Sequence, residues 1–268
     1  MLRKNHLQYS FSVSLNGEHL GDLDPRIRLV EVSEIPAEET VTIRRALTDG
    51  DPVALVRRQR LDVRLSLFLK EPEAAARSAL ISRISAFFRP GGVLTASWRP
   101  GLRLHVDTAS LPGIPGLPAW NQAMDVTLTA SAGPYWEDAE PVTVRQEIRR
   151  GTVTVTPPGQ LPYTALEADF QNLATQVLQV LEIQVYAGEE RVSYLSLSGL
   201  SVQTGEHVVI GYDGHGFLTI QAAGKSALSA RSAASSDALR VKTGVPNEIR
   251  IDSPRNLNMI LRMRGRYF

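Results

Sequence analysis

Residues 61–69 read LDVRLSLFL, and this stretch decides the fold class that the sequence predicts. Leucine or valine occupies every second position from Leu61 to Leu69, and Asp62, Arg64 and Ser66 stand among them. An apolar–polar alternation with a period of two is the pattern of a strand that is buried on one face. The stretch therefore predicts a β-strand whose leucines face a core.

The same alternation recurs on both sides of this stretch. Near the N-terminus it leads into Asn16-Gly17, a pair typical of the tight turn in a β-hairpin. Short apolar runs continue to the C-terminus at a close, regular spacing, which favours a β-sandwich in the second half. The further strand candidates are 8–15, 102–106, 124–128, 142–148, 178–185, 194–202, 208–210, 217–220, 239–241, 249–251 and 260–263.

One helix is predicted in the first half. Pro72 suits a first helical turn, and Pro90-Gly91-Gly92 ends the pattern. Between them lies an apolar stripe at helical spacing, with Arg77 and Arg83 off its centre. We expect this helix to cover one face of a sheet. The stripe consists of Ala76, Leu80, Ile81, Ile84, Phe87 and Phe88.

A domain boundary is expected between residues 140 and 160. Glu140-Pro141 follows an aromatic pair there, and the proline-rich TVTVTPPGQLPY comes after Arg149-Arg150-Gly151. We predict a mainly β protein with an N-terminal domain at 1–145 and a C-terminal β-sandwich at 146–268. A proline-rich loop at 111–118, LPGIPGLP, cannot pair in a ladder and is expected to be a stiff excursion.

Composition narrows the function. The formal net charge of +1 gives no overall field that would attract nucleic acid or an acidic membrane. The chain has no cysteine, which excludes disulfides and thiolate metal sites. No apolar run reaches the length of a signal peptide or a membrane span, so we expect the protein to be located in the cytoplasm after its synthesis.

No catalytic motif is visible. The five histidines are not spaced as metal ligands on a helix, and there is no phosphate-binding glycine loop. Asp213-Gly214-His215 could share a metal, but Asp-Gly also marks a hairpin tip, and we favour the tip because no third ligand is in view. We predict that the protein is not an enzyme and uses no cofactor.

Two sets of residues are candidates for interaction. Arg57, Arg58 and Arg60 form a basic run that could contact phosphates, although a solvated or interface-facing run is the plainer interpretation. Tyr135 and Trp136 follow a Gly-Pro bend just after a strand. They either fold back as a local plug or anchor an interface, since interfaces favour Tyr and Trp. The alternating Arg262, Arg264 and Arg266 are read as the basic outer face of a last strand.

The layout resembles the distal tail proteins (Dit) of siphophages over nearly the whole chain. The segment AMDVTLTASAGPYWEDAEP resembles the end of their N-terminal domain, and QYSFSVSLNG resembles their opening hairpin. The helix EPEAAARSALISRISAFFRPGG and the closing TGVPNEIRIDSPRNLNMILRMRGRYF are similar to the family's helix and final strands. Residues 31–56 have little that matches.

The resemblance implies a function. The N-terminal domain would be a belt that forms a hexameric ring at the tip of a long non-contractile tail, and the C-terminal domain would be galectin-like. The ring would join the tail tube protein to the baseplate hub and to tail fibre or receptor-binding proteins, with DNA only passing through its lumen. Such a protein is assembled in the host cytoplasm and becomes part of the virion. Tyr135 and Trp136 would then close the belt domain.

Two other functions stay open. The second half could be a carbohydrate-binding β-sandwich, in which Tyr186, Tyr194 and Tyr212 replace the missing tryptophans as stacking platforms. An enzyme whose site is scattered along the sequence is the other alternative.

Overall fold

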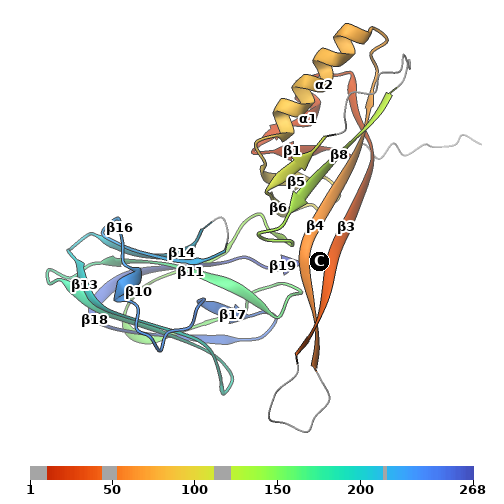
Figure 1. Ribbon diagram of the computed structural model, residues 1–268. Helices are drawn as coiled ribbons and strands as arrows, with labels where there is room; N and C mark the ends of the chain where they lie inside the picture. Colours follow the sequence, from red (N-terminus) through yellow and green to blue (C-terminus); the bar gives the residue numbers. More distant parts are fainter. Residues whose placement is uncertain (1–10, 44–52, 112–121, 214–215) are drawn as a thin grey trace, which may run out of the picture. The chain divides into compact units, whose positions relative to one another are not determined.

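The computed structural model describes residues 11–43, 53–111, 122–213 and 216–268, without the side chains of 39–43, 53–58 and 122–123. The chain forms two compact units, Met1–Trp136 and Glu137–Phe268, and each is described by itself (Figure 1). The strand β9 (Trp136–Asp138) contains the division. Both units consist mainly of strands, as the sequence predicts. The division into domains at 1–145 and 146–268 stays a prediction.

The first unit is built on an antiparallel sheet in the order β3-β4-β8-β7. A second run of strands has the order β6-β5-β1-β2. The bounds are β1 (Val13–Leu15), β2 (Glu18–His19), α1 (Leu20–Leu23), β3 (Ile27–Ile43), β4 (Val53–Leu69), α2 (Ala74–Phe88), β5 (Gly92–Ala96), β6 (Leu102–Val106), β7 (Thr108–Ser110) and β8 (Gln122–Ala130).

The alternation in residues 61–69 becomes the second half of β4, a central strand. Its leucines and valine are at most 2% exposed, and β3 and β8 flank it. Asn16 and Gly17 both have positive φ, 54° and 85°, in the turn between β1 and β2. This is the backbone that a two-residue hairpin turn requires, and it confirms the predicted turn.

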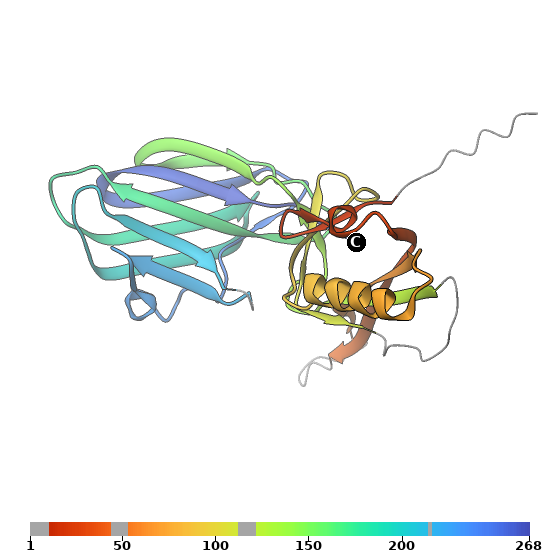
Figure 2. The ribbon, with the colours of Figure 1, turned by 90° about the horizontal axis from the view of Figure 1, so that it is seen from above.

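The predicted helix is α2, which lies beside β8 in both views (Figures 1 and 2). It begins at Ala74, so Pro72 precedes the helix instead of occupying its first turn. Leu80, Ile81, Ile84 and Phe88 are buried as expected, but Arg77 is buried too, because its guanidinium donates to the carbonyl of Glu71. The four-residue helix α1 was not predicted.

The second unit is a set of long antiparallel strands around one core. Its elements are β10 (Val142–Val155), β11 (Tyr163–Asn172), β12 (Leu178–Ala187), β13 (Glu190–Val202), β14 (His207–Tyr212), β15 (Leu218–Ala222), β16 (Lys225–Ser226), the 3-10 turn η1 (Leu228–Ala230), β17 (Arg240–Lys242), β18 (Asn247–Met263) and β19 (Arg266–Tyr267).

The strand β18 organises this unit because it changes partners halfway. Residues 248–252 pair with β12, residues 257–263 pair with β11, and β10 follows β18 on its other side throughout. At the change, buried Ser253 accepts a hydrogen bond from the Arg255 amide. The prediction of two separate strands, 249–251 and 260–263, was therefore wrong. A strand that moves from one layer to another closes a two-layer core.

Two more predictions need correction. The strand predicted at 142–148 continues to Val155 across a register shift, at which Arg149 alone stands opposite residues 253–256 of β18. The strand β11 was missed, since TALEADFQN is rich in residues with low β-propensity. The finer galectin-like assignment stays a prediction. The predicted loop 111–118 lies outside the described residues from position 112.

Candidate functional site: the polar face of the first unit

One face of the β3-β4-β8-β7 sheet is polar, while the other face is buried. The strand register places its residues in three rows, which run Glu31–Ser66–Asp125, Ser33–Arg64–Thr127–Ser110 and Ile35–Asp62–Thr129–Thr108. These residues alternate along β4 and β8 with side chains that are at most 5% exposed, such as Val63, Leu65 and Val126. We call these eleven residues the polar face.

Three charged groups of the polar face, Asp62, Arg64 and Asp125, have partners on it or beside it. Ser66 Oγ donates to Asp125 Oδ1 at 2.7 Å, and Thr129 Oγ1 donates to Asp62 Oδ1 at 2.7 Å. Arg60 Nη2 lies 3.0 Å from Asp62 Oδ2, and Arg64 Nε lies 3.8 Å from Asp125 Oδ2. Solvent-exposed pairs of this kind contribute little stability. Their effect is electrostatic, since each arginine stands beside a carboxylate.

The predicted basic run lies on β4, next to this face. By register, Arg57 is opposite Glu39 and Arg58 is opposite Glu38 on β3, although the side chains of Arg57 and Arg58 are outside the described part of the structure. Arg60 is the member whose side chain is described, in its ion pair with Asp62. The register therefore sets residues of opposite formal charge on neighbouring strands here. Their role in an interface stays a prediction.

Trp136 is fully buried at the end of the first unit. Its ring meets the ring of Trp98 edge-to-face at 6.5 Å between centroids, and the guanidinium of Arg99 lies 5.9 Å from its centre. Tyr135 is half-buried, and its amide donates to the Gly133 carbonyl. These contacts of Trp136 are those expected of a local plug. Its use as an anchor for a partner stays a prediction.

Glu34 ties this aromatic group to β3. It accepts hydrogen bonds from Trp98 Nε1 at 2.9 Å and from Arg99 Nη2 at 2.6 Å. Burial raises the pKa of the Glu34 carboxyl, but the hydrogen bonds from Arg99 and Trp98 outweigh it, so the pKa is lowered. The Nε1 of Trp136 is buried and has no hydrogen-bond partner within the described residues.

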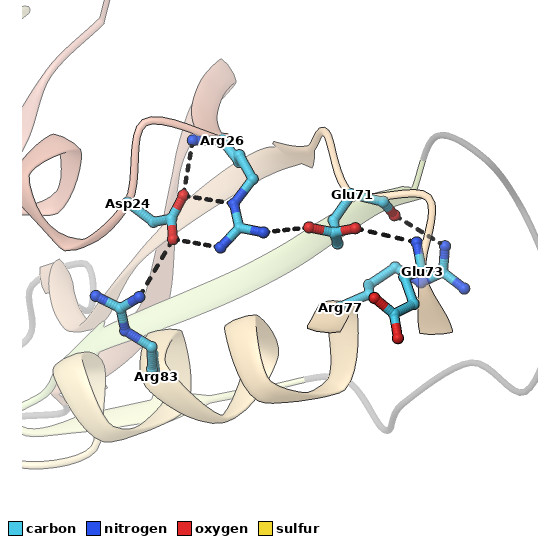
Figure 3. Close-up of polar contacts among 6 residues, drawn as sticks. All are labelled: Asp24, Arg26, Glu71, Glu73, Arg77 and Arg83. Atoms are coloured by element: carbon cyan, nitrogen blue, oxygen red, sulfur yellow. Dashed lines mark hydrogen bonds and ion pairs between the residues drawn. The ribbon is translucent and has the colours of Figure 1, made fainter. Parts of the chain in front are cut away.

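A network of ion pairs fixes α2 to the start of β3 (Figure 3). Asp24 is 7% exposed and accepts from the amide, Nε and Nη2 of Arg26 and from Nη1 of Arg83. Arg26 also pairs with Glu71, whose other oxygen accepts the amide of Glu73. The hydrogen bonds from Arg26 lower the pKa of Asp24 strongly. Arg83 is thus a structural residue and not a binding one.

The C-terminal arginines hold the start of the second unit. Arg264 Nη1 donates to the carbonyls of Asp138 and Ala139, and Arg266 Nε lies 3.1 Å from Glu137 Oε1. The Gly265 amide donates to Asp138 Oδ2 at 2.8 Å. Arg264 and Arg266 therefore do not form an outward basic face, as the sequence suggested. They satisfy backbone and carboxylate acceptors of the segment that enters this unit.

The tyrosines proposed as sugar platforms are already engaged. Arg250 lies 4.3 Å from the ring centre of Tyr186, and Arg191 lies 5.3 Å from that of Tyr194. Tyr212 donates its hydroxyl to the Leu239 carbonyl, and burial raises its pKa to about 12. Tyr212 is half-buried, and sugar binding by the second unit stays a prediction.

The other sites considered from the sequence, chiefly a metal site at Asp213-Gly214-His215, are not seen within the described residues. Gly214 and His215 of the suspected metal pair lie outside them. Within them, no cluster of three or more metal-ligating side chains occurs, and no helix is long and apolar enough to cross a membrane. His207 forms an exposed pair with Asp169 at 2.7 Å, on neighbouring strands.

Comparison with known proteins gives the class of the fold. No protein-family model matches the chain, and no curated protein matches its sequence. Solved structures do match over nearly its full length, and they belong to the adsorption apparatus and baseplates of phages. The chain therefore has the fold of this class of phage proteins.

One such structure is the Dit protein of phage SPP1, described as a paradigm of the hub adsorption apparatus in phages that infect Gram-positive bacteria. It matches with a TM-score of 0.67 at 13% identity, over 96% of this chain and 99% of its own. A chain of the phage P2 baseplate, in its activated conformation with Ca, matches with a TM-score of 0.53 at 7% identity, over 95% and 97%. The predicted resemblance to distal tail proteins is confirmed for the fold.

Proposed function

We propose that this protein is a structural component of the distal end of a long phage tail, where it forms a hexameric ring. The observation that carries the proposal is the likeness to SPP1 Dit, because it extends over both units and leaves almost none of either chain unmatched. A match to one unit alone would be evidence only for a shared β-domain. The ring would join the tail tube protein to baseplate hub and fibre proteins in the virion.

The composition of the polar face is compatible with the passage of DNA through the proposed ring. We infer that it lines the lumen of the ring. A surface that lets DNA slide must not collect phosphates, since each phosphate contact by Lys or Arg strengthens binding. Arg64 on this face is paired with Asp125, Arg60 beside it is paired with Asp62, and serine and threonine hydroxyls fill much of the rest of the face. Such a surface repels phosphates weakly and offers them no unpaired arginine among these residues.

The other side of the same sheet explains how the lining could be held in place. It is buried in the first unit, with the apolar residues of β4 and β8 almost without exposure. A ring needs heterologous contacts that repeat by rotation until they close. The first unit would supply those contacts. The second unit would contact other tail proteins.

The first test is negative-stain electron microscopy of the purified full chain, together with its mass in solution. We expect rings of six copies with an open centre, either alone or after co-expression with the tail tube protein of the same phage. A chain that stays monomeric in both cases, and that binds neither tube nor hub proteins, would contradict the proposal.

The lumen assignment has a separate test. Rings that carry both Asp62→Lys and Asp125→Lys should retain double-stranded DNA in gel-shift assays at a salt concentration where unchanged rings release it. The matched control is Glu189→Lys/Asp237→Lys, because it changes the charge by the same amount at two exposed residues of the second unit. Equal DNA retention by the control rings and the double variant would show that the polar face does not line the lumen.

A further inference from the structure

The strand β10 of the second unit has one open side. Within the described residues it pairs with β18 on one side and with no strand on the other. Its first part, Val142–Ile148, pairs without interruption, since the register shift comes only after Ile148. The free edge of a strand presents N–H and C=O groups that can pair with a further strand, and natural proteins usually cover or blunt it. The stretch 142–148 is therefore a candidate surface for strand pairing.

The two faces of this stretch carry different side chains. Val144 packs against the core of the second unit, and Ile148 belongs to that core with 7% exposure. Arg145 and Glu147 alternate with them, so they lie on the other face, where both are exposed. Their cross-strand partners on β18 are uncharged, and neither residue has a hydrogen bond or an ion pair to any part of the chain that the structure describes. The edge therefore carries one unpaired positive and one unpaired negative charge.

The sequence of this edge is complementary to itself. Residues 144–148 read VRQEI, with an apolar residue at each end, a basic and an acidic residue inside them, and Gln146 at the centre. When two copies of this segment align antiparallel about Gln146, Arg145 of each copy stands opposite Glu147 of the other. The same register sets Val144 opposite Ile148 on the core side. Opposite charges and apolar residues are the cross-strand pairs that stabilise antiparallel strands.

We propose that the open edge of β10 pairs with the same edge of a second copy of this chain, about a two-fold axis at Gln146. The contact is isologous, because one patch serves both copies. Main-chain hydrogen bonds hold the two strands, and the two charge pairs fix their register. An interface of about five residues a side is small, so the pairing is weak and depends on protein concentration. A six-fold axis does not generate this contact, so the proposal does not rest on the proposed ring.

The absence of cysteine in the chain allows a clean test by disulfide cross-linking. Directly opposite Cβ atoms of an antiparallel pair lie about 4.5–5.5 Å apart, near the separation that a disulfide needs. The full chain with Gln146→Cys should therefore form covalent dimers on oxidation, seen on a non-reducing gel, with a yield that rises with protein concentration. The control is Glu189→Cys, because Glu189 is exposed between β12 and β13, away from the β10 edge. A dimer yield no higher than that of the control overturns the proposal.

Charge reversal tests the register of the pair. In the Gln146→Cys chain, either Arg145→Glu or Glu147→Arg sets like charges opposite each other at two places, so the dimer yield of each variant should fall about tenfold at low protein concentration. An equal mixture of the two variants restores both pairs of opposite charge, and mass spectrometry should show disulfides that join one chain of each kind.

The mixture also controls for folding, because recovery of the yield requires both variants to be folded. Unchanged yields in the separate variants, or no recovery in the mixture, overturn the proposal. Both variants should still form rings in electron micrographs, since their changes lie outside the ring contacts of the first unit. The proposed function can therefore fail or stand separately.

Discussion

Removal of the Trp136 side chain should destabilise the first unit more than any neighbouring change. Trp136 is fully buried, meets Trp98 edge-to-face and lies under the guanidinium of Arg99. The substitution Trp136→Ala therefore leaves a large cavity and takes a partner away from two other side chains. If Trp136 instead served only as an anchor for a partner, its removal would hardly change the free energy of unfolding of the isolated chain.

The expected magnitude follows from these contacts. Truncation of a buried tryptophan to alanine costs about 3–5 kcal/mol. The same change removes an indole N–H that has no hydrogen-bond partner within the described residues. Loss of this buried unsatisfied donor reduces the destabilisation by about 1 kcal/mol. We therefore expect a net loss of about 3 kcal/mol. With an m-value of about 2 kcal/mol per M urea, the unfolding midpoint should fall by about 1.5 M. Trp136→Phe keeps a ring, loses the unpaired donor and should cost only about 1 kcal/mol.

The assay uses a property of the sequence. All three tryptophans, Trp98, Trp120 and Trp136, precede the second unit, so tryptophan fluorescence follows the unfolding of the first unit. Urea unfolding is recorded for the unchanged chain and for Trp136→Ala, with Tyr135→Ala as the control, since Tyr135 is only half-buried. If Trp136→Ala lowers the midpoint no more than Tyr135→Ala does, the plug interpretation is wrong.

Three further predictions concern stability. Because hydrogen bonds from Arg26 lower the pKa of Asp24 strongly, its stabilisation is complete above the ordinary Asp pKa of about 3.9 and is lost progressively as the pH falls towards the lowered pKa; Asp24→Asn should thus cost about 1–2 kcal/mol in urea unfolding at pH 7 and clearly less, but not zero, at pH 2.5. A Cβ on Gly265 would lie 2.6 Å from the Asp138 carboxylate, so Gly265→Ala should cost about 1–3 kcal/mol in thermal unfolding, whereas Gly133→Ala, with nothing within 4 Å, should be neutral; equal effects would contradict this. Tyr212→Phe removes one of the two donors to the Leu239 carbonyl, which keeps the Leu166 amide, and should destabilise the second unit by at most about 1 kcal/mol by circular dichroism, while an unchanged melting curve would show that the Tyr212 hydrogen bond contributes nothing.

The local pattern of apolar and polar residues predicted those helices and strands whose burial is uniform along their length. The strand at 61–69 is buried on one face throughout, so its alternation is complete in the sequence. The Asn16-Gly17 turn depends only on the backbone freedom of two residues. The strand β11 escaped detection because its buried positions hold Ala and Phe beside Glu, Asp and Gln, and pairing with β18 outweighs low propensity.

The candidate site shows a similar division. The polar residues of β4 can be identified from the sequence by their alternation with leucines. The residues of opposite charge that neutralise them cannot be identified in this way. Asp62 meets Thr129, and Ser66 meets Asp125, only because β4 and β8 pair in one register across more than fifty residues of chain. The roles of Arg83 and Arg264 were likewise hidden, since their acceptors lie far away in sequence.

The sequence by itself therefore determined the mainly β class, the central strand, the long helix and the absence of visible catalytic motifs, because these depend on spacing and composition within short windows. Only the tertiary structure decided that β18 is one strand shared by two layers, that Trp136 is enclosed beside Trp98, and that the arginines of the polar face are paired. The physical reason is that hydrogen-bond register and burial depend on contacts between distant segments, which residue order along one segment does not contain.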